Sequence, residues 1–173
     1  MMPVSPVAPI HTRFAFAMLA AVSFALASSA VLLADLMHLP APCTLCILQR
    51  FIFLVFCFWA VCGVVIPGAR RFWCVLLALT AACGLTAAGW QSWMEYAPDQ
   101  VTECGFGEPA LYEQLVNWLG AQWPSLFMVT GFCTQQDWYF LGLSLANWSI
   151  LFFLGLLLAA MYLFFRQEKP AAH

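Results

Sequence analysis

The chain has 173 residues, of which 64% are hydrophobic and only 8% are charged, and its formal net charge is −2. An ordinary soluble domain has about 25% charged residues, so this composition excludes a soluble globular fold and indicates an integral membrane protein. Six basic residues are too few to form a phosphate-binding surface, which excludes nucleic acid as a partner. The chain has eight cysteines, so the main question is which redox compartment each of them faces.

Four apolar stretches are each long enough to cross a bilayer. About 20 apolar residues span the hydrocarbon core, and a helix satisfies every backbone polar group within its own segment. Pro67 and Gly68 end the second stretch. We therefore predict an all-α fold in which residues 1–173 form a single membrane domain, an antiparallel four-helix bundle. Its spans are expected at about residues 14–34, 45–66, 72–90 and 145–165.

The basic residues predict the orientation of these spans. Five of the six flank the spans on one side, as the positive-inside bias requires if both termini are cytoplasmic: Arg13, Arg70, Arg71, Arg166 and Lys169. The segments 35–44 and 91–144 then face outward, and the longer one has acidic residues but no Lys or Arg. We expect a multi-pass protein of a bacterial inner membrane with a large periplasmic loop.

The first apolar stretch has a second interpretation, as a secretory signal peptide. Arg13 precedes it, and Ala25-Leu26-Ala27 resembles a cleavage site. The stretch continues from Ala27 to Ala34 without a charge, and this length favours a helix that spans the membrane.

The predicted topology divides the eight cysteines into two groups. Four lie inside the second and third spans, where a thiol behaves as a small apolar group: Cys57, Cys62, Cys74 and Cys83. The other four fall on the outer side, where disulfides form and persist: Cys43, Cys46, Cys104 and Cys133. We predict that the outer four are the catalytic residues.

Cys43-Thr44-Leu45-Cys46 places a Cys-x-x-Cys sequence at the start of the second span. A disulfide across two residues closes a small ring, and a helix N-terminus favours a thiolate. Both features suit a pair that opens and closes during a reaction. Zinc sites use the same spacing, and that alternative would recruit Cys104 and Cys133. No second Cys-x-x-Cys is present in the sequence, so we expect no metal.

Cys104 and Cys133 bracket a segment of the large outer loop, and two interpretations stay open for them. They form either a structural disulfide, which would contribute about 3–4 kcal/mol through loop-closure entropy, or a second redox pair that exchanges with the first by thiolate attack. Gly105 and Gly107 follow Cys104 closely and would leave it accessible to a partner.

Between these two cysteines, residues 109–119 predict a short amphipathic helix with Pro at its first turn. Leu111, Leu115, Trp118 and Leu119 share one face. Such a helix either lies in the lipid headgroup layer or packs against the bundle as a lid.

Arg50 is the one basic residue on the predicted outer half of the chain, four positions after Cys46. That spacing places it one helical turn away on the same face, so we expect its guanidinium near the Cys46 sulfur. It either extends to the headgroups or binds a quinone carbonyl and stabilises developing negative charge. The middles of the spans have no Asp, Glu, Lys or His, which argues against a proton or ion transporter.

The motifs resemble those of the DsbB family of disulfide bond formation proteins over nearly the whole chain. Pro42-Cys43-Thr44-Leu45-Cys46, followed by Arg50, resembles the family's Pro-Cys-x-Leu-Cys-x-x-x-Arg. Gly131-Phe132-Cys133 and Trp138-Tyr139-Phe140-Leu141-Gly142-Leu143 resemble its Gly-x-Cys and Trp-x-Phe-Leu-Gly-Leu. Many relatives carry a His where this chain has Gln91, which can donate a hydrogen bond but cannot be cationic.

The resemblance implies an electron route through both cysteine pairs. Cys104 and Cys133 would accept electrons from a DsbA-like periplasmic thiol oxidase, through a mixed disulfide at Cys104. Cys43 and Cys46 would reoxidise that pair, and Cys46 would pass the electrons to ubiquinone or menaquinone, with Arg50 near the ring.

Two rival interpretations accompany this one. A paralogue in the same family would serve a dedicated thioredoxin-like partner, and a non-enzymatic membrane scaffold would carry two structural disulfides.

Overall fold

Four long helices dominate the protein, and shorter elements lie near one end of them. The computed structural model describes residues 10–36, 43–97, 111–127, 129 and 139–166. In chain order the elements are α1 (Ile10–Leu36), α2 (Thr44–Val65), the 3-10 turn η1 (Pro67–Ala69), α3 (Arg70–Tyr96), α4 (Leu111–Gln122), α5 (Pro124–Phe127), β1 (Tyr139–Phe140), β2 (Leu143–Ser144) and α6 (Leu145–Arg166).

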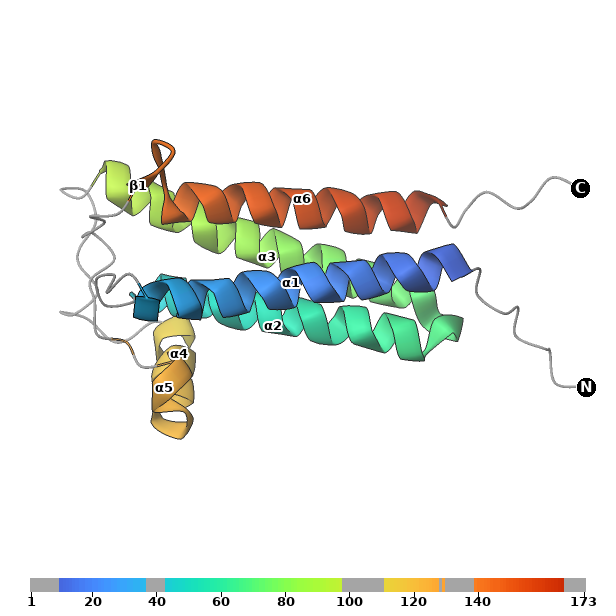
Figure 1. Ribbon diagram of the computed structural model, residues 1–173, viewed down its shortest axis with the longest axis horizontal. Coiled ribbons are helices and arrows are strands. Elements are labelled where there is room, and N and C mark those ends of the chain that lie inside the picture. Colours follow the sequence, from blue (N-terminus) through green and yellow to red (C-terminus); the bar gives the residue numbers. More distant parts are fainter. Residues whose placement is uncertain (1–9, 37–42, 98–110, 128, 130–138, 167–173) are drawn as a thin grey trace, which may run out of the picture.

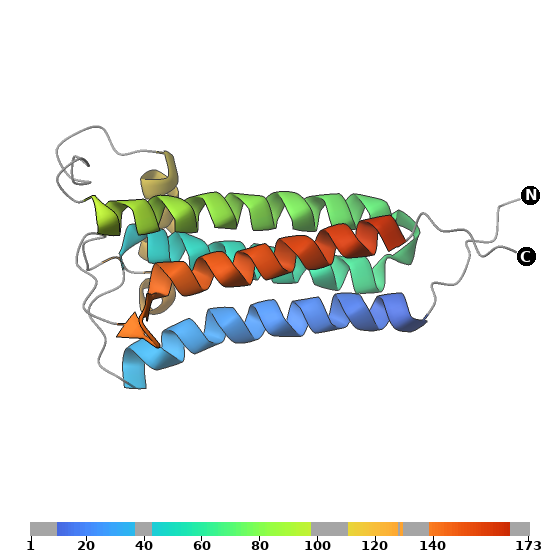
Figure 2. The ribbon, with the colours of Figure 1, turned by 90° about the horizontal axis from the view of Figure 1, so that it is seen from above.

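Helices α1, α2, α3 and α6 form the expected antiparallel bundle (Figure 1, Figure 2). Helix α1 packs against α2, α2 against α3, and α3 against α6. Each of these four is long and apolar enough to cross a membrane, so the chain is a multi-pass membrane protein with an all-α fold. Helices α2 and α6 begin, and α1 and α3 end, at the same end of the bundle. We refer to it as the Cys43 end.

Aromatic rings packed over glycines hold the helices together. Phe53 of α2 stacks on Phe153 of α6, with ring centroids 4.1 Å apart and planes 6° from parallel. The Phe153 ring lies over Gly84 of α3, and the Phe16 ring of α1 lies over Gly63 of α2, so closely that a Cβ at either glycine would overlap the ring. Small residues at such places let helices in a membrane approach closely, where van der Waals packing drives their association.

Helix α3 extends further at the Cys43 end than its predicted span. It continues to Tyr96, whereas the apolar stretch in the sequence ends near residue 90. Contacts with the neighbouring helices continue along this extension, because Gln91 is buried and Ser92 donates a hydrogen bond to Asn147 Oδ1 of α6 at 2.9 Å. Residues 91–96 are more polar than the predicted span before them, but the helix continues through them to Tyr96.

The short helix predicted at residues 109–119 is observed as α4, at Leu111–Gln122. Pro109, its predicted first-turn residue, lies outside the described residues. Figure 1 shows α4 and α5 lying across the bundle axis near the Cys43 end. A helix in this orientation runs parallel to the plane of a membrane that the bundle spans.

The apolar residues of α4 divide between two faces. Val116 and Leu119 are buried together with Ile47 of α2. The other three predicted face residues are exposed: Leu111, Leu115 and Trp118. Leu119 is thus the predicted face residue that lies next to the bundle, where it is buried beside Val116.

A two-stranded hairpin, which the sequence does not predict, leads into α6. Tyr139 pairs with Ser144 and Phe140 with Leu143, and the two residues between them both have positive φ, 53° at Leu141 and 78° at Gly142. This is the backbone of a type I′ turn, which favours glycine at such positions because a Cβ strains the left-handed region.

We expect Gly84→Ala to destabilise the bundle and Gly89→Ala to leave it as stable or slightly more so. Both glycines lie on α3, where alanine gains about 1 kcal/mol of helix propensity. Only at Gly84 would the added Cβ overlap a ring, since nothing lies within 4 Å of a Cβ at Gly89; overpacking costs about 1–3 kcal/mol. Thermal unfolding of both variants in the same detergent tests this, and equal melting temperatures would contradict it.

Candidate functional site

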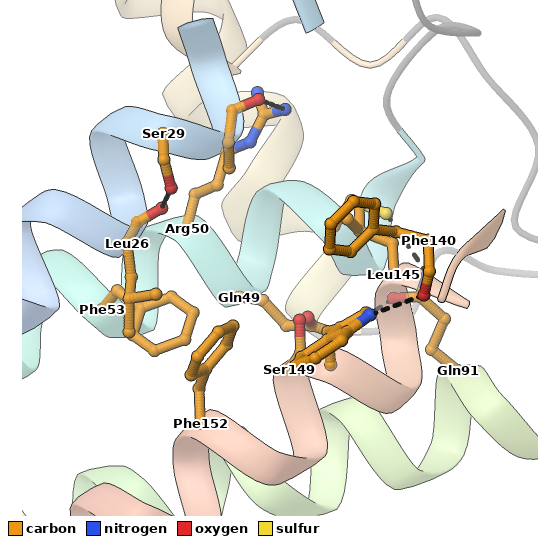
Figure 3. Close-up of a pocket in the computed structure, with 13 residues that line it drawn as sticks. Leu26, Ser29, Gln49, Arg50, Phe53, Gln91, Phe140, Leu145, Ser149 and Phe152 are labelled. Atoms are coloured by element: carbon orange, nitrogen blue, oxygen red, sulfur yellow. Dashed lines mark hydrogen bonds between the residues drawn. The ribbon is translucent and has the colours of Figure 1, made fainter. Parts of the chain in front are cut away.

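A cavity of about 260 Å³ opens between the helices near the Cys43 end. All four bundle helices and the hairpin contribute to its lining, among others through Ser29, Cys46, Arg50, Gln91, Phe140 and Phe152. Figure 3 shows Phe53, Phe140 and Phe152 directed toward this space from three different elements. The cavity is thus mostly apolar and aromatic, with a sulfur, two amides and a guanidinium in its wall.

The Cys-x-x-Cys sequence forms the first turn of α2, where the sequence places it. Cys43 is the N-cap residue, and its sulfur accepts a hydrogen bond from the Cys46 backbone N–H at 3.3 Å. The Cys43 thiol donates to the Cys46 sulfur, with the two Sγ atoms 3.0 Å apart. Both sulfurs therefore lie at the positive end of the helix dipole, which favours a thiolate.

The two sulfurs differ in their surroundings. Cys43 is only 4% exposed and packs with Leu45 and Met94, against which Tyr112 of α4 lies. Cys46 is half-buried and lines the cavity. Cys46 is therefore the member of the pair that a molecule in the cavity would meet.

A buried amide pair links the sulfur of Cys46 to two helices. Gln49 Nε2 of α2 donates to Gln91 Oε1 of α3 at 2.8 Å, and Gln91 Nε2 donates to Cys46 Sγ at 3.3 Å. Gln49 is 5% exposed and Gln91 is 1% exposed. An N–H donor on a sulfur favours its thiolate form, and Gln91 supplies such a donor to Cys46.

Arg50 lies in the cavity wall one turn after Cys46, and its side chain reaches the neighbouring helix. Its Nη2 donates to the carbonyl oxygen of Ala30 on α1 at 3.0 Å; Figure 3 shows the guanidinium directed toward that helix. The cation is thereby fixed at the boundary of the cavity. Its expected closeness to the Cys46 sulfur stays a prediction.

The hairpin places an aromatic ring at the cavity. Trp148 Nε1 of α6 donates to the carbonyl oxygen of Phe140 at 3.1 Å, and the two rings lie 6.1 Å apart. Trp148 also stacks on Phe152 one turn later, at 6.0 Å. The type I′ turn at Gly142 is what folds Phe140 back over the start of α6.

The other predicted outer cysteines, Cys104 and Cys133, lie outside the described residues. Within the described ranges, no cluster of three or more His, Cys, Asp or Glu side chains is arranged to hold a metal ion. The cysteines of the spans are dispersed along α2 and α3: Cys74 is buried and Cys83 is exposed at the bundle surface.

Several residues of the site cannot be recognised from the sequence alone. Gln49 has no local signal, because its partner Gln91 is 42 positions away. Ala30 acts through its backbone, which no side-chain pattern reveals. Phe140 belongs to a motif that resembles one of the DsbB family, but its place at the cavity depends on the hairpin.

We expect Trp148→Phe to loosen the hairpin while α6 stays helical. The variant keeps an aromatic ring but loses the N–H donor to Phe140, a hydrogen bond worth about 0.5–1.5 kcal/mol. Hydrogen exchange of the amides at 139–144 should become faster, by up to about tenfold. Trp93→Phe, on an exposed residue of α3, is the matched control, and equal exchange in both variants would contradict the role given to Trp148.

Comparison with known proteins agrees with the geometry of the site. Residues 12–163 match the family profile described as Disulfide bond formation protein DsbB. A relative named Disulfide bond formation protein B from Dechloromonas aromatica is 43% identical over 160 residues, covering 92% of this chain and 96% of the relative. A protein of the same name from an Azoarcus species is 42% identical over 130 residues, or 73% and 77% of the two chains.

A third, from Aromatoleum aromaticum, is 39% identical over 113 residues, or 63% and 66% of the two chains. The region that matches the family profile, residues 12–163, extends from α1 to the last turns of α6. It therefore includes the Cys-x-x-Cys turn, the hydrogen-bonded pair Gln49 and Gln91, and the cavity. The chain belongs to the DsbB family of disulfide bond formation proteins.

Proposed function

We propose that the protein is a protein-disulfide:quinone oxidoreductase, which oxidises a soluble thioredoxin-like protein and passes the electrons to a membrane quinone. One observation carries this proposal: Cys46 is in hydrogen-bond contact with Cys43 and at the same time lines a cavity between helices that span the membrane. A thiol pair beside a cavity at this place is suited to exchange electrons with a lipid-soluble acceptor.

The residues around the cavity fit a quinone ring. Quinone headgroups are flat and apolar with carbonyl oxygens at opposite edges, and the cavity offers the faces of Phe53, Phe140 and Phe152 together with polar groups in its wall. Its volume of about 260 Å³ lies just below the roughly 300–1,000 Å³ typical of sites for drug-sized ligands. This size suits a single ring whose isoprenoid tail stays among the helices or in lipid.

Ubiquinone or menaquinone, when bound, would supply the capacity to accept two electrons and two protons. The thiols of Cys43 and Cys46 together lose those two electrons and two protons when the S–S bond forms between them. The helix dipole and the Gln91 N–H favour the thiolate at Cys46. Their Sγ atoms, 3.0 Å apart, need only a small approach to reach the disulfide length of about 2.05 Å.

Arg50 is proposed to hold the carbonyl end of the quinone. Its guanidinium has five N–H donors, and its contact with Ala30 orients it in the cavity wall. A fixed cation there stabilises negative charge that develops on a carbonyl oxygen, and it needs no reorganisation during the reaction.

Cys104 and Cys133 are proposed to form the pair that meets the partner. A DsbA-like oxidase is a strong oxidant, at about −120 mV, so only a strong terminal acceptor can reoxidise it. A thiolate of the partner would attack Cys104 of a Cys104–Cys133 disulfide, forming a mixed disulfide and releasing the Cys133 thiolate. The second thiol of the partner would then displace Cys104, which leaves the partner oxidised and both Cys104 and Cys133 reduced. The released pair would then reduce the disulfide of Cys43 and Cys46.

This route also defines the proposed location. The Cys43 end faces the periplasm of a bacterial inner membrane, and both termini lie in the cytoplasm. The distribution of basic residues supports this orientation, because Arg70, Arg71 and Arg166 lie at the opposite end of the bundle from Cys43.

We expect the purified protein to reduce quinone anaerobically when a reduced thioredoxin-like protein is the electron donor. Cys43→Ser and Cys104→Ser should each abolish turnover, because each removes one pair from the electron route. The decrease in quinone absorbance measures the rate. Cys83→Ser is the control: this cysteine is exposed on the bundle surface away from the cavity, and its variant should keep the full rate.

The same assay separates the rival functions. A paralogue with a dedicated partner would turn over with one thioredoxin-like donor and not with others. A scaffold would show no turnover with any quinone while both cysteine pairs resist the reduced partner, and that result would overturn the proposed oxidoreductase.

We expect Arg50→Met to raise the KM for quinone by about 10- to 100-fold, the equivalent of one charged hydrogen bond of about 1.5–3 kcal/mol. Arg50→Lys should recover part of the loss, since it keeps the charge but not the planar fork. Arg166→Met, at the far end of α6, serves as the control for loss of a cation. A KM unchanged in Arg50→Met would place the quinone away from this residue.

A further inference from the structure

Ser149 of α6 contributes to the cavity wall a hydroxyl group that the proposed reaction does not use. The other polar side chains of the lining each take part in a hydrogen bond within the protein: Ser29, Cys46, Gln49, Arg50, Gln91 and Trp148. Ser149 is the polar side chain of the lining that makes no hydrogen bond with any residue that the structure describes. Its hydroxyl is therefore available to a molecule in the cavity.

Several serine and threonine hydroxyls elsewhere in the spans donate back to their own helix. Ser29 donates to the carbonyl oxygen of Leu26 at 2.9 Å, and Ser23 donates to that of Leu19 at 2.8 Å. Such a bond satisfies the hydroxyl between apolar helices, where an unpaired one is costly. Ser149 lies on an equally regular helix and does not make this bond, so a ligand that accepts its hydrogen would remove the cost.

Ser149 and Arg50 belong to different walls of the cavity. The Arg50 guanidinium is held at the carbonyl oxygen of Ala30 on α1, whereas Ser149 belongs to α6, which packs against α3. Figure 3 shows the guanidinium beside α1 and Ser149 on α6, on different sides of this space. A quinone has carbonyl oxygens at opposite edges of its ring. A ring held at one edge by Arg50 therefore turns its other edge toward another wall.

The other polar groups near that wall are already committed. Gln49 Nε2 donates to Gln91 Oε1, and Gln91 Nε2 donates to Cys46, so these two bonds orient both amides. Trp148 has a single N–H donor and uses it on the hairpin. The hydroxyl of Ser149 can rotate, and it can either donate to a carbonyl oxygen or accept from a hydroxyl group. It is thus the group best suited to a second oxygen of the ring.

We propose that Ser149 binds the second carbonyl oxygen of the quinone, at the edge opposite the one that Arg50 holds. Its hydroxyl donates to this oxygen in the quinone and accepts the O–H of the quinol, whereas a guanidinium can only donate. The protein thereby distinguishes the two edges of the ring, because negative charge is stabilised at the Arg50 edge. This inference rests on the proposed function, since it takes a quinone as the occupant of the cavity.

Infrared spectroscopy of a bound short-tailed ubiquinone, labelled with carbon-13 at one carbonyl or at the other, tests this inference. The full-length chain is used without an electron donor, and a hydrogen bond lowers the stretching frequency of the carbonyl that accepts it. We expect Ser149→Ala to raise the frequency of one labelled carbonyl toward its value in apolar solvent. Arg50→Met should raise the frequency of the other. Ser149→Thr keeps a hydroxyl group and should retain the original frequencies.

The affinity for the same quinone gives a second readout, followed by quenching of tryptophan fluorescence. We expect Ser149→Ala to weaken binding by about 2- to 10-fold, as the loss of one neutral hydrogen bond does. Ser23→Ala is the matched control, because it removes a hydroxyl that donates within α1 and does not line the cavity. Its affinity and both carbonyl frequencies should equal those of the unsubstituted chain.

The outcomes separate this inference from the proposed function. If Ser149→Ala leaves both carbonyl frequencies unchanged, or if it shifts the same carbonyl as Arg50→Met, Ser149 does not hold the second edge and the inference is overturned. Quinone binding itself would then still stand. If no quinone binds to the unsubstituted chain, the proposed function is overturned together with the inference.

Discussion

The hydrogen bond between the buried amides of Gln49 and Gln91 is the interaction on which the rest of the site depends. Between apolar helices, water does not compensate an unpaired amide, and leaving one unpaired costs several kcal/mol. Each glutamine therefore needs the other, and their 2.8 Å contact fixes the register of α2 against α3. That register brings Gln91 to the Cys46 sulfur.

Close packing elsewhere in the bundle keeps this register from slipping. Gly84 and Gly63 allow the rings of Phe153 and Phe16 to lie directly on the helix backbone, and Phe53 stacks on Phe153 between them. The Phe53 and Phe153 rings lie near the middle of the bundle and Phe16 lies near the end opposite Cys43, whereas the cavity lies nearer the Cys43 end. Polar chemistry and dense packing are thus separated along the same helices.

Much of the fold was predictable from the sequence because its signals are local and strong. Each span is a long apolar stretch, and the Cys-x-x-Cys sequence lies at the start of one, so the place of Cys43 at the N-cap of α2 follows from pattern alone. The position of the short helix was also predicted to within a few residues. Family membership followed from motifs in the same segments, and the comparisons confirm it.

The parts that were not predicted depend on contacts between distant residues. The sequence gives no sign that α3 continues to Tyr96, because its last turns are held by contacts with distant residues, such as Ser92 with Asn147 of α6 and Met94 with Leu45 of α2. The burial of Leu119 on α4 depends on its contact with a cluster that includes Ile47 of α2. The hairpin depends on two consecutive positive φ angles, one of them at a leucine, where propensity alone argues against the turn.

The burial of Cys43 has a consequence for the selectivity of electron transfer. Small thiols and bulk oxidants reach a sulfur at a rate that depends on its exposure, and this sulfur is 4% exposed beneath Leu45, Met94 and Tyr112. The Cys43 sulfur is therefore shielded from small thiols in the solution, whereas Cys46 is half-buried and lines the cavity. In the proposed reaction, thiols and oxidants from the solution would therefore compete poorly at Cys43 with a partner that fits the protein.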